Sequence, residues 1–300
     1  MTINVSVRVP DGIVLASDSL ASSFKPVQAN IQLQPFDCGK CGATIKPGLV
    51  QAPVGVLPGS STPLASKLFY VGNYGVTFFG AAAINGRSVF NHVMMFRTKS
   101  FDPRAGLAQI ASQLAEQLQE AVVADPMIKQ APQGTLIVGF QVCGYDEVDI
   151  DVGQTSVVTL TAGKAPSIKE QKREFGVTVT GQQEVAKKLF ANLSGGVSAQ
   201  PNFTTMTLPD AIDYAKFLVQ ATSDYQRFAD MVPNVGGPVE VALITKWIGF
   251  RFVQRKKLLG DETTRLNIGK IHHELATLRQ EIPSLVRDAL QLSDDDEATS

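Results

Sequence analysis

Thr2 is the residue whose type and place in the chain most directly suit catalysis. The initiator methionine is normally removed when a small residue follows, and loss of Met1 would leave a threonine with a hydroxyl and a free α-amine. An α-amine titrates near about pH 8, so at neutral pH a fraction of it can accept the hydroxyl proton. Thr2 could then act as a nucleophile that carries its own general base.

The three histidines are poorly placed for the alternative of a histidine-based triad. His92 lies in a predicted helix, and His272 and His273 lie near the C-terminus. Adjacent residues on a helix point to different sides, so His272 and His273 also make a poor pair of metal ligands. We therefore do not expect a triad of the serine–histidine–aspartate type.

The three cysteines do not form a disulfide framework, which is typical of a protein from a reducing compartment. Cys38 and Cys41 have the C-x2-C spacing of one half of a zinc site, but Cys143 is the only further cysteine. We favour two thiols in a loop over a metal site. A zinc site shared between two copies of the chain is the remaining alternative.

Charge and hydropathy exclude several classes of function. The net charge is −1, and no basic stripe with interleaved aromatic residues is present, so nucleic-acid binding is not expected. No apolar run reaches the roughly 18 residues that cross a bilayer, and the N-terminus lacks the pattern of a signal peptide. We therefore expect a cytoplasmic protein that binds neither membranes nor nucleic acid.

The first predicted strands place Thr2 at the start of a β-hairpin. Residues 2–9 alternate apolar and polar side chains, as a half-buried strand does. Pro-Asp-Gly at 10–12 supplies a turn, and residues 13–17 form a second strand. Residues 22–63 then carry six prolines, which predicts a long insertion or a Pro-rich loop that is not part of the core.

The remaining elements come in blocks of strands and blocks of helices. Residues 135–142 are continuously apolar and predict a strand buried on both faces, and residues 104–124 have the apolar stripe of an amphipathic helix. Segregated blocks predict helices that flank antiparallel sheets. The further predicted strands are 67–80, 148–152, 156–162, 175–180, 239–245 and 247–253, and the further predicted helices are 84–98, 182–193, the segment that begins at 208, and 265–292.

The stretch that begins at Thr2, with DGIVLASDS in its second strand, resembles the proteasome β-subunit family, including its bacterial relatives. In that family a nucleophilic threonine opens the first strand and a buried aspartate ends the second, so the resemblance implies these roles for Thr2 and Asp18. SKLFYVGNYGVTFFG is similar to the family's strand that begins with the catalytic lysine and leads to a glycine whose N–H stabilises the oxyanion. The resemblance therefore implies those roles for Lys67 and Gly80.

Two later segments extend the resemblance over most of residues 2–246. Thr180 precedes a glycine where the family has a serine before a glycine, and it keeps the hydroxyl, so the resemblance makes Thr180 a further site residue. Residues 234–246, NVGGPVEVALITK, are similar to the family's glycine pair before a late strand. Val235 and Val232 stand where active members have a serine and an aspartate.

The resemblance implies an α+β fold, a four-layer αββα sandwich of the N-terminal-nucleophile (Ntn) hydrolase type. Residues 1–255 would form the hydrolase domain, with 22–63 as a Pro-rich insertion. Residues 256–292 would form a C-terminal helical extension, and the acidic residues 293–300 would form a disordered tail.

The function that the resemblance implies is hydrolysis of peptide bonds by Thr2, without a cofactor. The implied partners are a peptide or unfolded protein as substrate, further copies of the chain in a ring or stacked rings, and an unfoldase. Two alternatives stay open. One is a non-catalytic scaffold or assembly protein of the same fold, which Val232 and Val235 favour. The other is an Ntn amidohydrolase that acts on small amides.

Overall fold

The computed structural model describes residues 2–33, 36–37, 40–41, 44–45, 48–62, 65–146, 149–171, 174–191, 201–229 and 233–256. These residues belong to a compact unit, Met1–Lys256, and Lys257–Ser300 form a second unit that lies outside the described residues. The predicted helical extension after residue 256 and the predicted acidic tail therefore also lie outside them.

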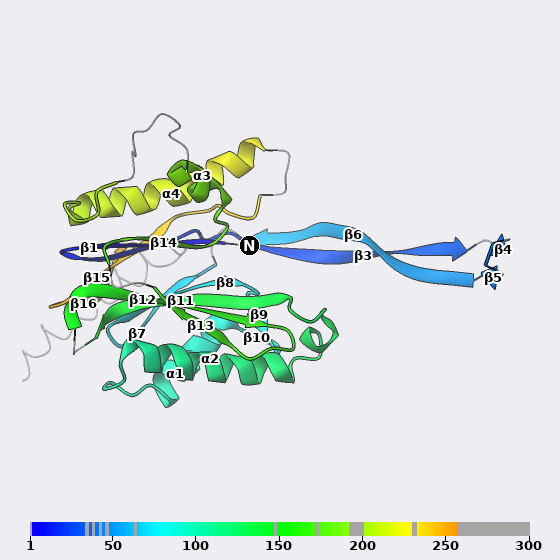
Figure 1. Ribbon diagram of the computed structural model, residues 1–300, viewed down its shortest axis with the longest axis horizontal. Helices are drawn as coiled ribbons and strands as arrows, with labels where there is room; N and C mark the ends of the chain where they lie inside the picture. Colours follow the sequence, from blue (N-terminus) through cyan, green and yellow to red (C-terminus); the bar gives the residue numbers. More distant parts are fainter. Residues whose placement is uncertain are drawn as a thin grey trace, which may run out of the picture. The chain divides into compact units, whose positions relative to one another are not determined.

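Two five-stranded antiparallel sheets form the centre of the described unit (Figure 1). In the first sheet the order is β14 (Gly176–Gly181), β1 (Ile3–Val9), β2 (Gly12–Ser17), β15 (Glu240–Thr245) and β16 (Gly249–Gln254). In the second it is β13 (Ser167–Glu170), β12 (Asp149–Thr161), β11 (Leu136–Asp146), β8 (Tyr74–Gly80) and β7 (Leu68–Val71). The prediction of an α+β protein with antiparallel sheets is confirmed.

Helices pack on the outer side of each sheet (Figure 1). Helix α4 (Leu208–Phe228) packs on β1 and β2, and α3 (Glu184–Ala191) packs on α4. Helix α2 (Leu107–Ala124) packs on β11 and β12 of the second sheet, next to α1 (Val89–Lys99). Among the described residues, no helix combines the length and the apolar character that crossing a membrane requires.

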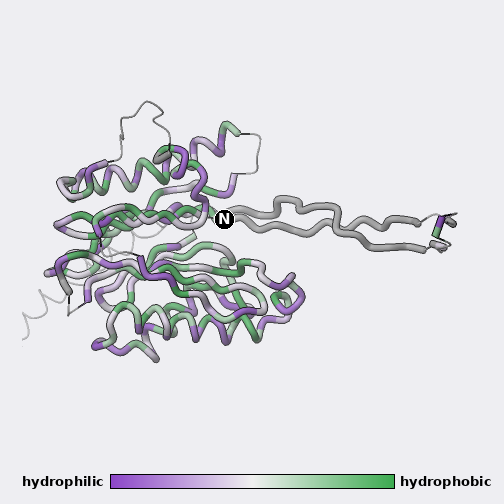
Figure 2. The backbone as a smooth tube through the Cα atoms, in the orientation of Figure 1, coloured by the Kyte–Doolittle hydropathy of each residue, from purple (hydrophilic) through white to green (hydrophobic). Residues whose placement is uncertain are grey.

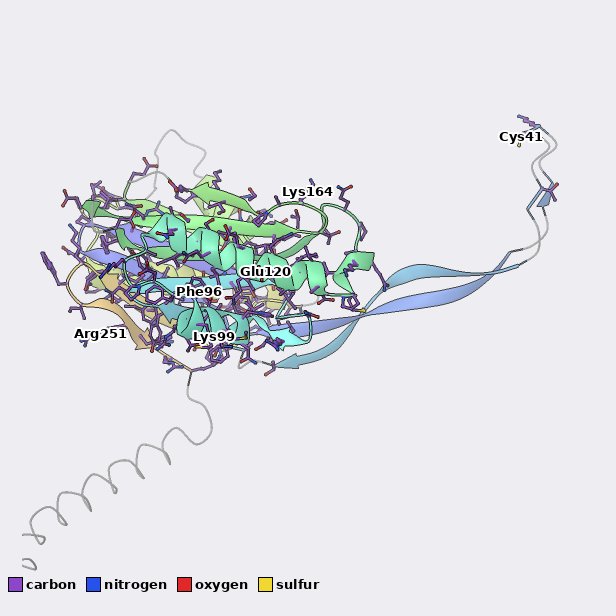
Figure 3. The ribbon with its side chains drawn as sticks, turned by 90° about the horizontal axis from the view of Figure 1, so that it is seen from below. Cys41, Phe96, Lys99, Glu120, Lys164 and Arg251 are labelled. Atoms are coloured by element: carbon purple, nitrogen blue, oxygen red, sulfur yellow. The ribbon has the colours of Figure 1, made fainter. Side chains whose placement is uncertain are left out.

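The helix sequences explain where each helix begins and which side is buried. Ser88 caps α1, because its Oγ accepts from Asn91 N, and Thr207 caps α4 in the same way. Phe96 of α1 points into the core, whereas Lys99 at the end of that helix is exposed (Figure 3). The apolar stripe of α2 is buried as predicted, and Figure 2 shows hydrophobic residues gathered along the stacked strands.

Strand β1 differs from its prediction, because it is buried on both faces rather than on one. Its apolar residues, among them Ile3 and Val5, join the core against α4. Its polar residues face the second sheet, where Ser6 and Arg8 lie near Cys143 of β11. Alternation therefore reflects two different buried environments here, and not a solvent-exposed face.

Of the two predictions for residues 22–63, a long insertion or a Pro-rich loop, the loop is wrong for the described part of this segment. Strands β3 (Ala21–Leu33) and β6 (Gly48–Thr62) pair in a long antiparallel ribbon, with the short pair β4 (Phe36–Asp37) and β5 (Thr44–Ile45). Both strands of a two-stranded ribbon are edges, and edges tolerate proline because one side of each strand needs no N–H donor. Two register shifts, next to Pro53 and Pro58, mark the bulges at which proline is also accepted.

Strands β12 and β13 also differ from the predicted strands. Residues 148–152 and 156–162, predicted as two strands, form the single strand β12. Strand β13 was not predicted, because its four residues are all exposed and lack an apolar alternation. The short elements β9 (Ala83–Ile84), β10 (Arg87–Ser88) and η1 (Ile128–Gln130) surround the start of α1 and the end of α2.

Candidate active site

Asp18 lies at the end of β2, beside the start of β1, because the β1–β2 hairpin pairs Asn4 with Ser17. Its side chain is fully buried and is held by an ammonium group and three backbone amides. The partners are Lys67 Nζ at 3.0 and 2.9 Å, Ile3 N at 3.1 Å, Leu20 N at 3.2 Å and Gly236 N at 3.1 Å. This number of donors favours the carboxylate form.

Lys67 is the other half of a buried ion pair. Its side chain is 4% exposed, and Nζ donates to both carboxylate oxygens of Asp18 and to the carbonyl oxygen of Leu20 at 2.5 Å. Burial lowers the pKa of Lys67 and raises the pKa of Asp18, and the attraction between the two charges opposes both shifts. Removal of either partner would leave the other charge buried without compensation, which is costly.

The backbone around Thr2 is fixed by its neighbours on β14. Thr2 is 3% exposed, and its carbonyl oxygen accepts a hydrogen bond from Gln182 N at 2.8 Å. Gly181 has φ +79, and a Cβ at this position would lie 1.8 Å from the Thr2 carbonyl oxygen. Only glycine fits so close to the threonine, which explains a glycine immediately after Thr180.

A cavity of about 660 Å³ opens beside Thr2 and Lys67. Most of its wall is apolar, and its polar residues are Thr2, Lys67 and Asp125. The wall includes Leu20, Ala65, Phe78, Gly80, Ala81, Ala82, Ala83, Met127, Leu136 and Ile137. A site with a few converging polar groups in a mostly apolar cavity is the usual form of a small-molecule or peptide subsite.

Gly80 lines this cavity, and the neighbouring hydrogen bonds indicate which way its N–H points. Successive N–H groups of β8 point alternately to β7 and to β11. Phe78 N–H donates to Lys67 O, on the β7 side. Ala81 N–H donates to Ile137 O, on the β11 side. Gly80 N–H therefore points to the β7 side, beyond the first residue of β7, and its φ of +96 is a conformation that favours glycine.

The hydroxyl of Thr180 has its hydrogen-bond partner on the second sheet. It is 3% exposed, and its Oγ1 accepts a hydrogen bond from Gln141 Nε2 of the second sheet at 2.7 Å. Within the described part of the chain, no hydrogen bond joins Thr180 to Thr2. Thr180 thus lies next to the glycine that contacts Thr2, and its hydroxyl links the two sheets.

The alternative of a zinc site at Cys38 and Cys41 lies partly outside the described residues. Cys38 lies outside them, and Cys41 is an exposed free thiol. In the ranges that the structure describes, no group of three or more histidine, cysteine, aspartate or glutamate side chains could hold a metal ion. His272 and His273 also lie outside these ranges.

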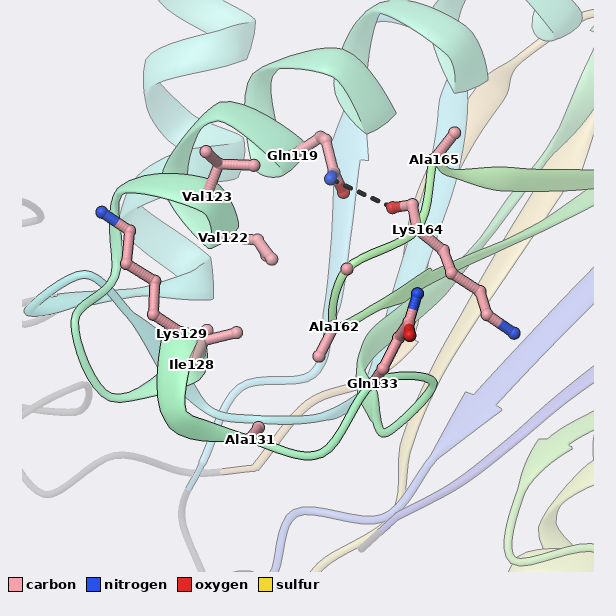
Figure 4. Close-up of a pocket in the computed structure, with 11 residues that line it drawn as sticks. Gln119, Val122, Val123, Ile128, Lys129, Ala131, Gln133, Ala162, Lys164 and Ala165 are labelled. Carbon is pink, nitrogen blue, oxygen red and sulfur yellow. Dashed lines mark hydrogen bonds between the residues drawn. The ribbon is translucent and has the colours of Figure 1, made fainter.

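A second cavity, of about 620 Å³, lies between the end of α2 and the turn after β12 (Figure 4). Lys129, Lys164 and Gln119 stand around an apolar floor, and Gln119 Nε2 donates to the carbonyl oxygen of Lys164. None of the predicted site residues lines this cavity. The cavity beside Thr2 is therefore the candidate active site.

Two charged residues near the site were missed by sequence reasoning. Glu240 and Lys256 are buried, and the carboxylate of Glu240 accepts a hydrogen bond from the backbone N–H of Lys67. The signal was present in the sequence, because Glu240 is an acidic residue inside the apolar run VEVALIT. A charged residue in such a run is rarely buried without a partner.

Comparisons with known proteins give distant structural likenesses. No family model matches the chain, and no curated protein matches it. Among solved structures, it is similar to the helical assembly of the Anbu complex from Pseudomonas aeruginosa, with 13% identity, a TM-score of 0.49, and coverage of 92% of this chain and 96% of that chain. Anbu (ancestral beta-subunit) from Yersinia bercovieri matches with 12% identity, a TM-score of 0.47, and coverage of 93% and 97%.

A further match is the Anbu (Gly-1) mutant from Hyphomicrobium sp. strain MC1, with 11% identity, a TM-score of 0.46, and coverage of 92% and 97%. At these identities and TM-scores the likenesses are too distant to transfer a function. They do correct the family assignment made from the sequence. The structural neighbours are Anbu proteins, and no model of the proteasome β-subunit family matches, so membership of that family is wrong for this chain.

Proposed function

We propose that the chain is a threonine hydrolase of amide bonds, with peptide bonds as the expected substrate and Thr2 as the nucleophile once Met1 is removed. The observation that carries this proposal is the position of Thr2. It lies at the rim of a mostly apolar cavity, next to a buried lysine–aspartate ion pair. A nucleophile, a cation and a substrate-sized space are thereby combined at one place.

The proposed reaction begins with transfer of the Thr2 hydroxyl proton to the α-amine of the same residue. The hydroxyl oxygen attacks the amide carbonyl carbon, and the α-ammonium gives its proton to the leaving nitrogen as the C–N bond breaks. Water then attacks the resulting ester and gives a proton to the α-amine. As the C–O bond to Thr2 breaks, the α-ammonium returns that proton to the Thr2 oxygen and the acid product leaves. Atoms and charge balance without a cofactor.

The surrounding residues would support the charges of this reaction. The ammonium of Lys67 lowers the cost of deprotonating the Thr2 hydroxyl and disfavours a second positive charge on the α-amine. Asp18 keeps Lys67 in place and charged. Gly80 N–H would donate to the carbonyl oxygen as it becomes negative, which is a large catalytic effect when the donor is preorganised. We assign Thr180 a supporting role behind Thr2, through its neighbour Gly181.

We further propose that the two sheets with their outer helices form the αββα sandwich of Ntn hydrolases. The packing of α4 and α3 on one sheet and of α2 and α1 on the other supports this proposal. Residues 1–255 would be the hydrolase domain, with the β3–β6 ribbon as its insertion. The β1–β2 hairpin would then bring Thr2, just before β1, and Asp18, just after β2, to the same end of the sheet, where the reaction is proposed to occur.

The decisive experiment measures the N-terminus and its reactivity. Intact-mass measurement should show loss of Met1, and a peptide epoxyketone should label the protein once, because that probe reacts with both a hydroxyl and an α-amine. Thr2→Ser should retain labelling, and Thr2→Ala should abolish it. Thr98→Ala, at an exposed helix position, is the matched control and should label like the wild type. Equal labelling of Thr2→Ala and the wild type would refute the proposal.

Kinetics test the assigned role of Lys67. Lys67→Met should lower kcat for a fluorogenic peptide by about 10²- to 10³-fold, because a preorganised charge at the reacting atoms is lost. A panel of peptides and small acyl amides, assayed in parallel, separates a peptidase from an amidohydrolase of small amides. Turnover of small amides alone would move the proposal to the second class of substrate.

A non-catalytic assembly protein is the second candidate function, and Val235 favours it. Val235 is buried in the apolar core against α4, so this position offers no hydroxyl to the α-amine of Thr2. Retention of Met1 in the purified protein, with no turnover of any panel substrate, would support this candidate.

Self-association is proposed for either function. Phe217, Tyr225 and Phe228 recur at helical spacing along α4 and are 52%, 50% and 77% exposed, which is apolar area suited to contact between copies. Light scattering of the purified protein should give a mass above that of one chain, and charged substitutions at these positions should lower it. An unfoldase partner stays an expectation from sequence.

A further inference from the structure

Glu240 and Lys256 form a second buried ion pair close to the first. Their side chains are 1% and 2% exposed, and Lys256 Nζ lies 3.8 Å from Glu240 Oε2. This separation is too long for a hydrogen bond, and within the described residues neither atom has a hydrogen-bond partner. Burying two charges is costly, and apolar side chains of similar volume would often stabilise a fold as well or better. Stability alone therefore does not explain this pair.

The pair is connected directly to the lysine of the candidate site. The backbone N–H of Lys67 donates to the carboxylate of Glu240, while the ammonium of Lys67 is held by Asp18. Glu240 is the first residue of β15 and lies opposite Ser17, the residue before Asp18. Two carboxylates on neighbouring strands thus fix Lys67, one at its backbone and one at its side-chain end.

Lys256 reaches this place because β16 runs antiparallel to β15 and pairs Gln254 with Val241, so the next residues pass the start of β15. Gln254 Nε2 donates to the carbonyl oxygen of Val239, so the end of β16 lies against the start of β15. The ammonium of Lys256 is also near enough to Lys67 for the like charge to lower the pKa of Lys67, in addition to the larger effect of burial. Glu240 acts on that pKa in the opposite direction.

We propose that Glu240 and Lys256 are positioning residues for the threonine hydrolase reaction. Glu240 fixes the backbone of Lys67, and Lys256 holds Glu240 in place and keeps a second positive charge behind Lys67. The inference rests on the proposed function, because the pair acts on catalysis only through Lys67. Neither residue lines the cavity beside Thr2, so neither is assigned a contact with substrate.

The charged groups around Lys67 decide what a substitution should do. They are Asp18 after β2, Glu240 on β15 and Lys256 after β16, and Arg255 acts on Glu240 and Lys256. Loss of the Lys256 charge removes repulsion from Lys67, so the pKa of Lys67 should rise. The alkaline limb of the pH profile of kcat/KM, which reports loss of the Lys67 proton, should then move to higher pH.

The test uses Lys256→Met in the full chain, with Lys246→Met as the matched control. Lys246 pairs with Asp151 at the surface, 3.5 Å away, so the same substitution there changes an exposed ion pair instead of a buried one. Lysine-selective NMR follows the titration of Lys67, assigned by its loss in Lys67→Met. We expect a raised pKa of Lys67 and a kcat lowered about 10- to 100-fold in Lys256→Met only, with KM changed less than about twofold.

A second variant guards against failure to fold. Glu240→Gln alone would leave Lys256 buried and unpaired, so Glu240→Gln/Lys256→Met is used, in which both charges are removed and an acceptor for Lys67 N–H remains. This variant should fold and show the same loss of kcat. Wild-type kcat, pH profile and Lys67 titration in both variants would overturn the proposal and make the pair purely structural. If even the wild type cleaves no amide, the proposed function fails, and the Lys67 titration still decides whether the pair acts on Lys67.

Discussion

The two faces of β1 in the first sheet are both buried, yet they differ in chemistry. The face toward α4 is apolar, with Ile3, Val5 and Val7 of β1 in one continuous core. The face toward the second sheet carries Asn4, Ser6 and Arg8 from the same strand, all buried. The site residues Asp18, Lys67 and Thr180 are also buried, close to this second face.

The difference shows how the fold separates stability from chemistry. Apolar side chains against the helices contribute about 25 cal/mol for each Å² removed from water. A buried ion pair needs hydrogen-bond donors and acceptors around it, and these polar groups add little net stability. The helix-facing cores therefore hold most of the buried apolar residues, and the space between the sheets combines the polar site with a smaller apolar cluster that includes Ile13, Leu15 and Ile244.

The largest expected effect comes from breaking the ion pair. Asp18→Asn leaves the ammonium of Lys67 buried without a counter-charge, so the free energy of unfolding in urea should fall by about 3–5 kcal/mol and amide hydrolysis should stop. Asp18→Asn/Lys67→Met should recover at least half of the lost stability and no activity. A loss below about 1 kcal/mol in the single variant would contradict the account of the pair.

A matched substitution on the helix side sharpens this result. Leu114→Ala in α2, which is fully buried in the apolar core, should cost about 2–5 kcal/mol. At a temperature where this variant is folded, its kcat should equal that of the wild type. A comparable loss of stability with opposite consequences for activity would establish the division between the two regions.

An intermediate effect is expected at alkaline pH, from Cys143 between the sheets. Burial raises the pKa of its thiol from 9.0 to about 11. As pH rises, the thiol ionises in the unfolded chain before it ionises in the folded protein. The contribution of the protonated Cys143 to the free energy of unfolding is therefore complete below about pH 9, and about 3 kcal/mol of it is lost by about pH 11. The free energy of unfolding should fall less steeply over this range in Cys143→Ala than in the wild type. The exposed Cys41→Ala is the control and should follow the wild type.

The smallest expected effects on stability come from exchanging an apolar and a hydroxyl side chain at two adjacent residues of β8. Val76 and Thr77 are both fully buried, and Val76 joins the apolar core against the helices. Val76→Thr should cost about 1–3 kcal/mol, because a hydroxyl enters an apolar core. Thr77→Val should be neutral or stabilise by up to about 1 kcal/mol, since the Thr77 hydroxyl has no hydrogen-bond partner in the described residues. Thermal denaturation of both variants measures the difference, and equal effects would remove the distinction between the faces.

Much of the fold could be predicted because periodicity and turn residues were clear. The α2 stripe and the Pro-Asp-Gly turn between β1 and β2 predicted their elements. The alternation in β1 was misread as partial exposure, because period alone does not distinguish water from a polar interior. The β3–β6 ribbon was missed because its prolines, tolerated at edges and bulges, mimic the composition of a loop.

The site could be predicted only in part. The structure brings Asp18 and Lys67 together beside Thr2, and their catalytic roles stay a proposal. The partner of Thr180, Gln141, lies on the other sheet and could not be foreseen from local sequence. Lys256 was missed for the same reason, because its contact with Glu240 depends on the pairing of β16 with β15.

The prolines of the β3–β6 ribbon have a consequence for the behaviour of the protein in concentrated solution. Strands of 13 and 15 residues that, in the described chain, pair only with each other leave long open edges, on which strands of neighbouring molecules could add and grow into fibrils. Pro26, Pro53 and Pro58 lie in these strands without an amide donor, and proline on an exposed strand hinders the addition of a further strand. The prolines that make the ribbon resemble a loop in the sequence therefore also oppose its aggregation.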